Sequence, residues 1–145
     1  MWSALKSLFD VTEQRDDSGK LQLAAAALLI EVSKADYATD SAEQQAVIAA
    51  IRQHTGLQDD ELNTLLTQAQ QTSAASTSLY EFTSLINANY SEQQKFNLIR
   101  ELWRVAAADG EIHKYEDHLI RQIAELLYVP HAQFIRAKLE VLAVV

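Results

Sequence analysis

The strongest constraint on this fold is a pattern of apolar and acidic residues that occurs twice, 73 positions apart. In the second copy an apolar stretch ends at Asp109-Gly110, and Glu116 follows seven residues after the aspartate. In the first copy a similar stretch ends at Asp36, and Glu43 follows at the same distance. The same offset pairs Leu29 with Leu102, Val32 with Val105, Ala35 with Ala108 and Leu66 with Leu139. These pairs indicate an internal duplication.

The spacing of the apolar residues predicts helices throughout. The chain has only three Gly and one Pro, so it contains few residues that end helices, and no segment shows a sustained strand alternation. A length of 145 residues is typical of one domain. We therefore predict an all-α fold with seven to eight helices, which form two pseudo-symmetric helical units in one bundle over residues 20–145.

Individual segments give more detailed expectations. Apolar residues at helical spacing predict helices over 20–36, up to Gly56, over 57–69, over 79–86, after Ser91, over 119–127 and after Pro130. In the last of these we expect Phe134, Ile135, Leu139 and Leu142 to form the apolar face. The polar run 68–78 predicts a hinge between the two halves. Phe96 and Trp103 are expected in the core, and His54, His118 and His131 at the surface or at helix caps.

We predict that residues 1–19 form an N-terminal amphipathic segment and a linker. Trp2, Leu5, Leu8 and Phe9 recur at helical spacing. This face predicts a helix that packs on the domain, and the alternative is a weak membrane-surface or partner anchor through residues 1–9. The longest unbroken apolar run has eight residues, too few to cross a bilayer, and the N-terminus lacks the pattern of a secretory signal. We expect a cytoplasmic protein.

The two acidic bends are the best candidates for chemistry. Asp36 and Asp109 follow the carboxyl ends of predicted helices, where a bare carboxylate is disfavoured, so a nearby cation would stabilise them. Glu43 and Glu116 fall in the first turn of the next helix, where acids are favoured. Two such bends about a pseudo-twofold axis can bring four carboxylates together, which suits a divalent cation such as Ca²⁺, Mg²⁺ or Mn²⁺.

An ordinary structural explanation of the same acids stays open. Asp109 before Gly110 can be a polar turn residue, and Glu43 can form a capping box with Asp40. Glu116 can be a surface acid that the helix dipole favours. His113 stands where Asp40 stands in the first copy and is a poor N-cap, so the capping explanation does not extend to Glu116.

Several classes of site are excluded. The chain has no Cys, so zinc-thiolate and thiol chemistry are absent. The spacing after Asp109 does not fit an EF-hand, and there is no Glu-x-x-His quartet for a di-iron centre, no phosphate loop and no nucleophile elbow. With 12 basic and 20 acidic residues the formal net charge is −8, and we expect no nucleic-acid partner.

The stretch from Leu102 to Ile112, followed by Glu116 and by Ile123-Ala124-Glu125-Leu126-Leu127, resembles the TerB-like family. That family includes tellurite-resistance proteins and the N-terminal domain of some membrane-bound DnaJ-type co-chaperones. The resemblance covers roughly residues 20–139. It implies an all-helical fold of two pseudo-symmetric units, acidic residues that bind divalent metal, and a stress-response or membrane-associated context. The first copy departs from the pattern, because Tyr37 stands where Gly110 stands in the second.

Our leading hypothesis is a non-enzymatic helical module that binds a divalent cation or a protein partner at the acidic bends, with Asp36, Glu43, Asp109 and Glu116 as metal ligands. The alternative is a pure protein-interaction scaffold without metal. A variant of this alternative is a scaffold that associates with a membrane. A hydrolase that uses the carboxylates as acid and base is disfavoured, because no nucleophile or oxyanion donor can be named.

Overall fold

The computed structural model describes residues 19–33, 41–75, 78–108 and 110–144, and for 41–43, 75 and 144 it describes the backbone alone. Residues 19–33 form the first described helix. The others are α2 (Ser41–Thr55), α3 (Asp59–Ala75), α4 (Tyr80–Asn89), α5 (Glu92–Ala106), α6 (Lys114–Leu126) and α7 (His131–Val144). Within these ranges every regular element is a helix, which confirms the predicted all-α class. The predicted N-terminal amphipathic segment lies outside the described residues.

The helix boundaries repeat at the offset found in the sequence. Helices α2 and α3 begin at residues 41 and 59, and adding 73 to these positions gives 114 and 132. Helices α6 and α7 begin at residues 114 and 131. Helix α4 has no counterpart and lies between the two copies in the chain. The duplication therefore extends from the motif to the order and spacing of these two pairs of helices.

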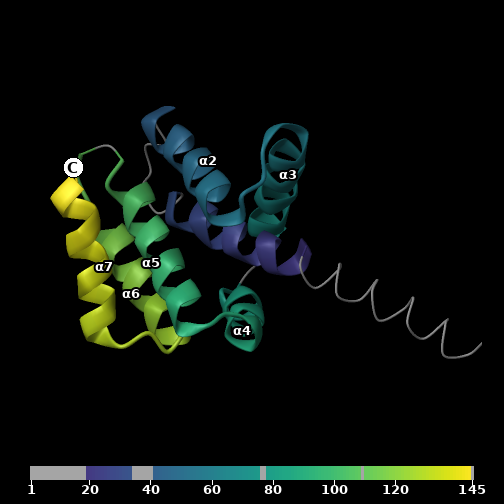
Figure 1. Ribbon diagram of the computed structural model, residues 1–145. Coiled ribbons are helices and arrows are strands. Elements are labelled where there is room, and N and C mark those ends of the chain that lie inside the picture. The colour runs from purple at the N-terminus through teal and green to yellow at the C-terminus, as the bar shows by residue number, and fades with distance from the viewer. Residues whose placement is uncertain (1–18, 34–40, 76–77, 109, 145) are drawn as a thin grey trace, which may run out of the picture.

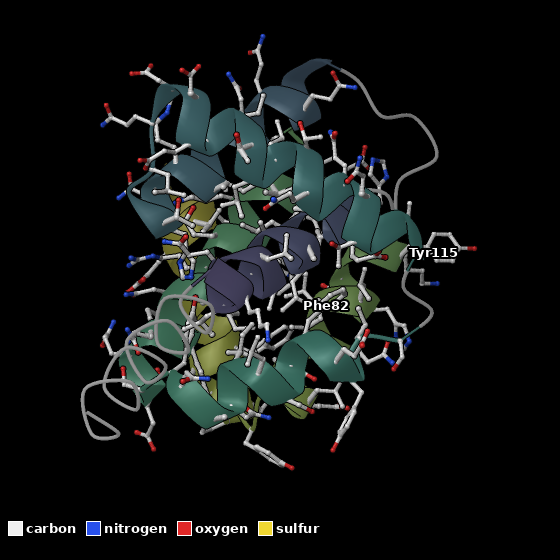
Figure 2. The ribbon with its side chains drawn as sticks, turned by 90° about the vertical axis from the view of Figure 1, so that its right-hand side faces the viewer. Phe82 and Tyr115 are labelled. Atoms are coloured by element: carbon white, nitrogen blue, oxygen red, sulfur yellow. The ribbon has the colours of Figure 1, made fainter. Side chains whose placement is uncertain are left out.

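The helix over 19–33 is buried on all sides between residues 24 and 30. Every residue from 24 to 30 is buried, together with Val32 and Ser33. Figures 1 and 2 show this helix between α3 and α4, with α5, α6 and α7 beyond it. A helix without a polar face is stable only when other elements surround it. Its four consecutive alanines, Ala24 to Ala27, are all buried, and their small side chains keep the helix narrow.

Two aromatic side chains, Phe82 and Tyr115, have opposite environments. Figure 2 shows Phe82 between α4 and the 19–33 helix, and this residue belongs to the buried cluster. Tyr115, in the first turn of α6, projects away from the ribbon and is 68% exposed. Helix α4 therefore contributes an aromatic ring to the core, whereas the start of α6 presents one to solvent.

Helix α5 is the central helix of the second half. It begins with a capping box, in which Gln94 N–H donates to Ser91 Oγ at 3.2 Å and Ser91 N–H donates to Gln94 Oε1 at 2.8 Å. This confirms the start predicted at Ser91. Phe96 and Trp103 are buried as expected, and the Trp103 ring centroid lies 5.1 Å from that of Phe134 on α7.

The predicted hinge over 68–78 is wrong for most of its length. Helix α3 continues to Ala75, six residues beyond the predicted end at 69. The extension has a packing cause, because Ala69 and Ser73 continue the buried face of Leu62 and Leu65. Ser73 Oγ also donates a hydrogen bond to Glu31 on the 19–33 helix. The polar composition of residues 68–78 gave no indication that α3 continues this buried face.

The apolar face predicted for the last helix is partly wrong. Phe134, Ala137 and Val141 are buried, whereas Leu139 is 59% exposed and Leu142 is also exposed. Ala137 and Val141 continue the line set by Phe134, so the buried stripe passes beside the leucines. Helix α7 therefore presents apolar side chains to solvent on its outer face.

Candidate functional site

The four predicted metal ligands differ in what the structure describes. Asp36 and Asp109 lie outside the described residues. Glu43 lies in the first turn of α2, as predicted, but its side chain is not described. Glu116 is described in full, in the first turn of α6. The proposed convergence of all four carboxylates therefore stays a prediction.

Glu116 is a buried carboxylate with 0% exposure. Its Oε1 accepts a hydrogen bond from the backbone N–H of His113 at 3.0 Å. This is the bond that an acid at the third position of a capping box makes to the N-cap residue, so the expectation that capping does not extend to Glu116 is wrong. The carboxylate can make this bond because it needs only the backbone of His113, whatever its side chain. The description of Glu116 as a surface acid is wrong as well.

The connection before α6 is held by backbone hydrogen bonds at the end of α5. Ala107 N–H donates to Trp103 O at 2.9 Å, and Gly110 N–H donates to Ala107 O at 3.0 Å. Gly110 has φ +90°, in the region that favours glycine, which explains why the second copy has a glycine after its aspartate. These backbone hydrogen bonds and the φ of Gly110 thus shape the connection that leads into α6.

Glu116 has the donor chemistry that a hard divalent cation requires, because a carboxylate supplies oxygen ligands. In the parts of the chain that the structure describes, no group of three or more His, Asp or Glu side chains could hold a metal ion. A metal at this bend would therefore need ligands from the residues that lie outside the description, such as Asp109. Glu116 would be the buried ligand of such a metal.

Sequence reasoning missed a polar cavity of about 410 Å³, bordered by the 19–33 helix, the end of α2 and the first half of α5. His54 Nε2 and Tyr90 Oη lie 2.6 Å apart within it. Burial lowers the pKa of His54 below its ordinary value of 6.5 and raises the pKa of Tyr90 to about 12. His54 was expected at the surface or at a cap, as His118 and His131 were, and those two are exposed.

Glu101 borders the same cavity and is 3% exposed. Burial raises the pKa of its carboxyl group, and the neighbouring Arg104 and Arg100 oppose that shift. Glu101 forms an ion pair with Arg104, one turn further along α5. Its position three residues before Arg104 on the amphipathic helix α5 was the available signal, because an acid and an arginine at this spacing can form an ion pair.

The fold defines a class of protein, an all-helical chain in which helices α2 and α3 recur as α6 and α7 at the offset of the sequence repeat. The family described as tellurite resistance protein TerB matches residues 22–139, and the chain belongs to this family. Searches of curated proteins and of solved structures found no significant match. Among the described residues, none of the helices has the length and apolar character needed to span a membrane.

Proposed function

We propose that this chain is a non-enzymatic module that binds a divalent cation at its acidic bends, through Asp36, Glu43, Asp109 and Glu116, and that the metal-bound form recruits a protein partner. The observation that carries the proposal is the complete burial of Glu116 beside the bend. A buried carboxylate is costly unless hydrogen bonds or a cation compensate its charge. The proposed cation is Ca²⁺, Mg²⁺ or Mn²⁺, because these prefer oxygen ligands.

The repeat supports the proposal. The helices that follow the two bends, α2 and α6, begin 73 residues apart, which supports equivalent places for Glu43 and Glu116 in the two units. Family membership gives the context, and we extend it to a cytoplasmic role in the response to stress such as tellurite exposure. We also propose that the module is non-enzymatic, because the sequence offers no positioned nucleophile or oxyanion donor that can be named.

The test is isothermal titration calorimetry of the full chain with Ca²⁺, Mg²⁺ and Mn²⁺, for the wild type and for Glu116→Gln. Glutamine keeps an oxygen that can accept the His113 N–H but removes the charge, so the fold should persist while metal affinity falls at least tenfold. Glu125→Gln is the matched control, because Glu125 is an exposed acid on the same helix. Absence of binding heat and of a thermal shift at millimolar metal would rule out the metal site.

A second candidate is a protein-interaction scaffold that needs no metal. The exposed Leu139 and Leu142 on α7 favour it, because apolar side chains at the surface are a usual feature of partner-binding faces. Partner capture that survives Asp109→Asn with Glu116→Gln, but is lost after Leu139→Ser with Leu142→Ser, would support this scaffold over the metal-dependent module. Deletion of residues 1–10 tests the N-terminal anchor in the same assay.

A further inference from the structure

A cavity of about 500 Å³ lies between the first turns of α5 and of α7, beside the connection from α6 to α7. Figure 1 shows α5 and α7 side by side, with their first turns at the same end of the bundle. The volume falls within the range of roughly 300–1,000 Å³ that small-ligand sites occupy. The cavity is at the end of α6 opposite the acidic bend, about 20 Å away along the helix axis. It is therefore separate from the proposed metal site.

Two basic side chains border the cavity, although the chain as a whole has a net charge of −8. The Arg136 guanidinium carbon lies 4.1 Å from the centroid of the buried Phe96 ring, a cation–π contact that holds the planar group against the cavity wall. Its Nε faces Glu140 Oε1 at 4.0 Å, at the protein surface, where such a pair contributes little. The two terminal nitrogens of Arg136 are thus the atoms best suited to bind a ligand.

Lys95 is the second basic residue of the cavity. Its Nζ lies 6.0 Å from the centroid of the Tyr128 ring. Within the described parts of the chain it forms no ion pair with a carboxylate. Glu92 is the one acidic residue that borders the cavity, so the lining carries a local excess of positive charge. Oxyanions are the natural ligands of lysine and arginine side chains.

Tyr128 has a backbone conformation that tyrosine rarely adopts. Its φ is +58°, and its ring is 80% exposed at the edge of the cavity. Tyr128 N–H donates to Glu125 O at 3.1 Å, and Val129 N–H donates to Ala124 O at 2.9 Å. These two bonds form a Schellman motif, in which the residue at the position of Tyr128 is usually glycine.

The second helix of the first copy ends with that usual residue, one position further along than the 73-residue offset from Tyr128 would place it. Helix α2, the counterpart of α6, is followed by Gly56 with φ +75°. The second copy therefore holds an exposed aromatic ring at a position where glycine would relieve the backbone. A strained residue at the edge of a cavity points to a function for its side chain, because stability alone would favour glycine.

We infer that this cavity binds a small organic anion in which a carboxylate is attached to a flat aromatic group. The carboxylate lies between Lys95 and Arg136, where charge-assisted hydrogen bonds hold it. The aromatic group stacks on the Tyr128 ring. The side-chain amides of Gln93 and Gln133, which also border the cavity, supply neutral hydrogen bonds to further polar groups of the ligand.

The test is an NMR titration of the full chain with benzoate, with phenyl phosphate and with the neutral benzamide, each up to millimolar concentration. We expect benzoate to shift the backbone amide signals of Lys95, Tyr128 and Arg136 in a saturable manner, and benzamide to leave them unchanged. Equal shifts with benzamide would overturn the role of the anion. Binding of phenyl phosphate without benzoate would overturn the carboxylate, and no saturable shift with any probe would overturn the site.

Variants separate the roles of the residues. Arg136→Gln should weaken benzoate binding about tenfold through loss of a charge-assisted hydrogen bond. Arg121→Gln is the matched control, because Arg121 has the same 53% side-chain exposure and also lies over an aromatic ring, that of Phe134, but outside this cavity. Arg121→Gln should leave benzoate binding unchanged, and an equal loss in both variants would overturn the assignment of Arg136.

Tyr128→Gly tests the strain argument directly. We expect it to weaken benzoate binding about three- to tenfold through the lost stacking surface, and to leave the midpoint of thermal unfolding unchanged or higher. A lower midpoint would show that the ring is kept for packing and would contradict a ligand-binding role. Calcium titration of the same variants gives an independent readout, which should match the wild type whether or not the metal proposal holds.

Discussion

His54 and Tyr90 join the end of α2 to the connection between α4 and α5 through a side-chain hydrogen bond of 2.6 Å between Nε2 and Oη. Their ring centroids are 5.6 Å apart. Both side chains are half-buried. This pair is thus a direct polar link between the first copy of the repeat and the segment that leads into the second.

Tyr90→Phe removes the hydroxyl group and keeps the ring. We expect the free energy of unfolding to fall by about 1 kcal/mol, because His54 loses a partner in a half-buried setting. Urea denaturation measures the change. Tyr80→Phe is the control, since Tyr80 is an exposed tyrosine in the first turn of α4, and it should leave the urea midpoint unchanged. Equal effects of the two variants would contradict a stabilising role for the His54–Tyr90 bond.

The pH dependence of stability follows from the lowered pKa of His54. The unfolded chain binds a proton at His54 as the pH falls through 6.5, whereas the folded chain binds it only at lower pH. The free energy of unfolding should therefore decrease on acidification below about 6.5. His54→Gln should lose this decrease. Paired denaturant curves at several pH values measure the difference between the two proteins.

Glu101 changes the pH dependence of the free energy of unfolding in the opposite direction to His54, so the two contributions must be measured separately. Because its pKa is raised above 4.5, the folded chain binds that proton first as the pH falls, which adds stability on acidification. Comparison of the wild type with Glu101→Gln isolates this contribution. If His54→Gln kept the full decrease below pH 6.5, another group would be responsible for it.

Gly110→Ala tests the backbone of the acidic bend. A Cβ at this position would meet no heavy atom within 4 Å, so the cost comes from φ +90° alone. We expect a loss of about 1–2 kcal/mol in the free energy of unfolding. Gly19→Ala is the matched control, because a Cβ there also has free space and the φ is not positive, and it should be neutral or slightly stabilising. Thermal denaturation distinguishes the two variants.

The two faces of α7 predict opposite outcomes for truncation to alanine. Val141→Ala should cost about 2 kcal/mol, because Val141 is buried and the change leaves a cavity. Leu139→Ala should change the free energy of unfolding by less than about 0.5 kcal/mol, because Leu139 is mostly exposed. Urea denaturation of dilute protein tests both. A large cost for Leu139→Ala would mean that this face is covered in solution.

The helical class and most helix boundaries were predictable because they depend on local signals. Ser91 with Gln94 and Gly56 are such signals, and each performs its predicted role in the structure. The end of α3 was not predictable in this way, because Ser73 continues the helix through a contact with Glu31, 42 residues away. Likewise, the choice of Val141 over Leu139 for the core depends on where the neighbouring helices lie.

In the candidate sites, too, features that depend on neighbouring residues were predictable, whereas contacts between distant residues were not. The repeat predicted two acidic bends, but the burial of Glu116 and its bond to His113 required the fold. Tyr128 carries no sequence signal of its own, since a tyrosine after a helix is ordinary until its φ is known. His54 and Tyr90 are 36 residues apart, and their pairing depends on how α2 meets the segment before α5.

The buried 19–33 helix has a consequence for the synthesis of the chain. The ribosome releases this apolar segment well before α4 and α5, which begin at residues 80 and 92. During that interval the nascent polypeptide exposes Leu28, Leu29 and Ile30 without the helices that later enclose them. Until α4 and α5 emerge, this helix keeps apolar surface that chaperones can bind.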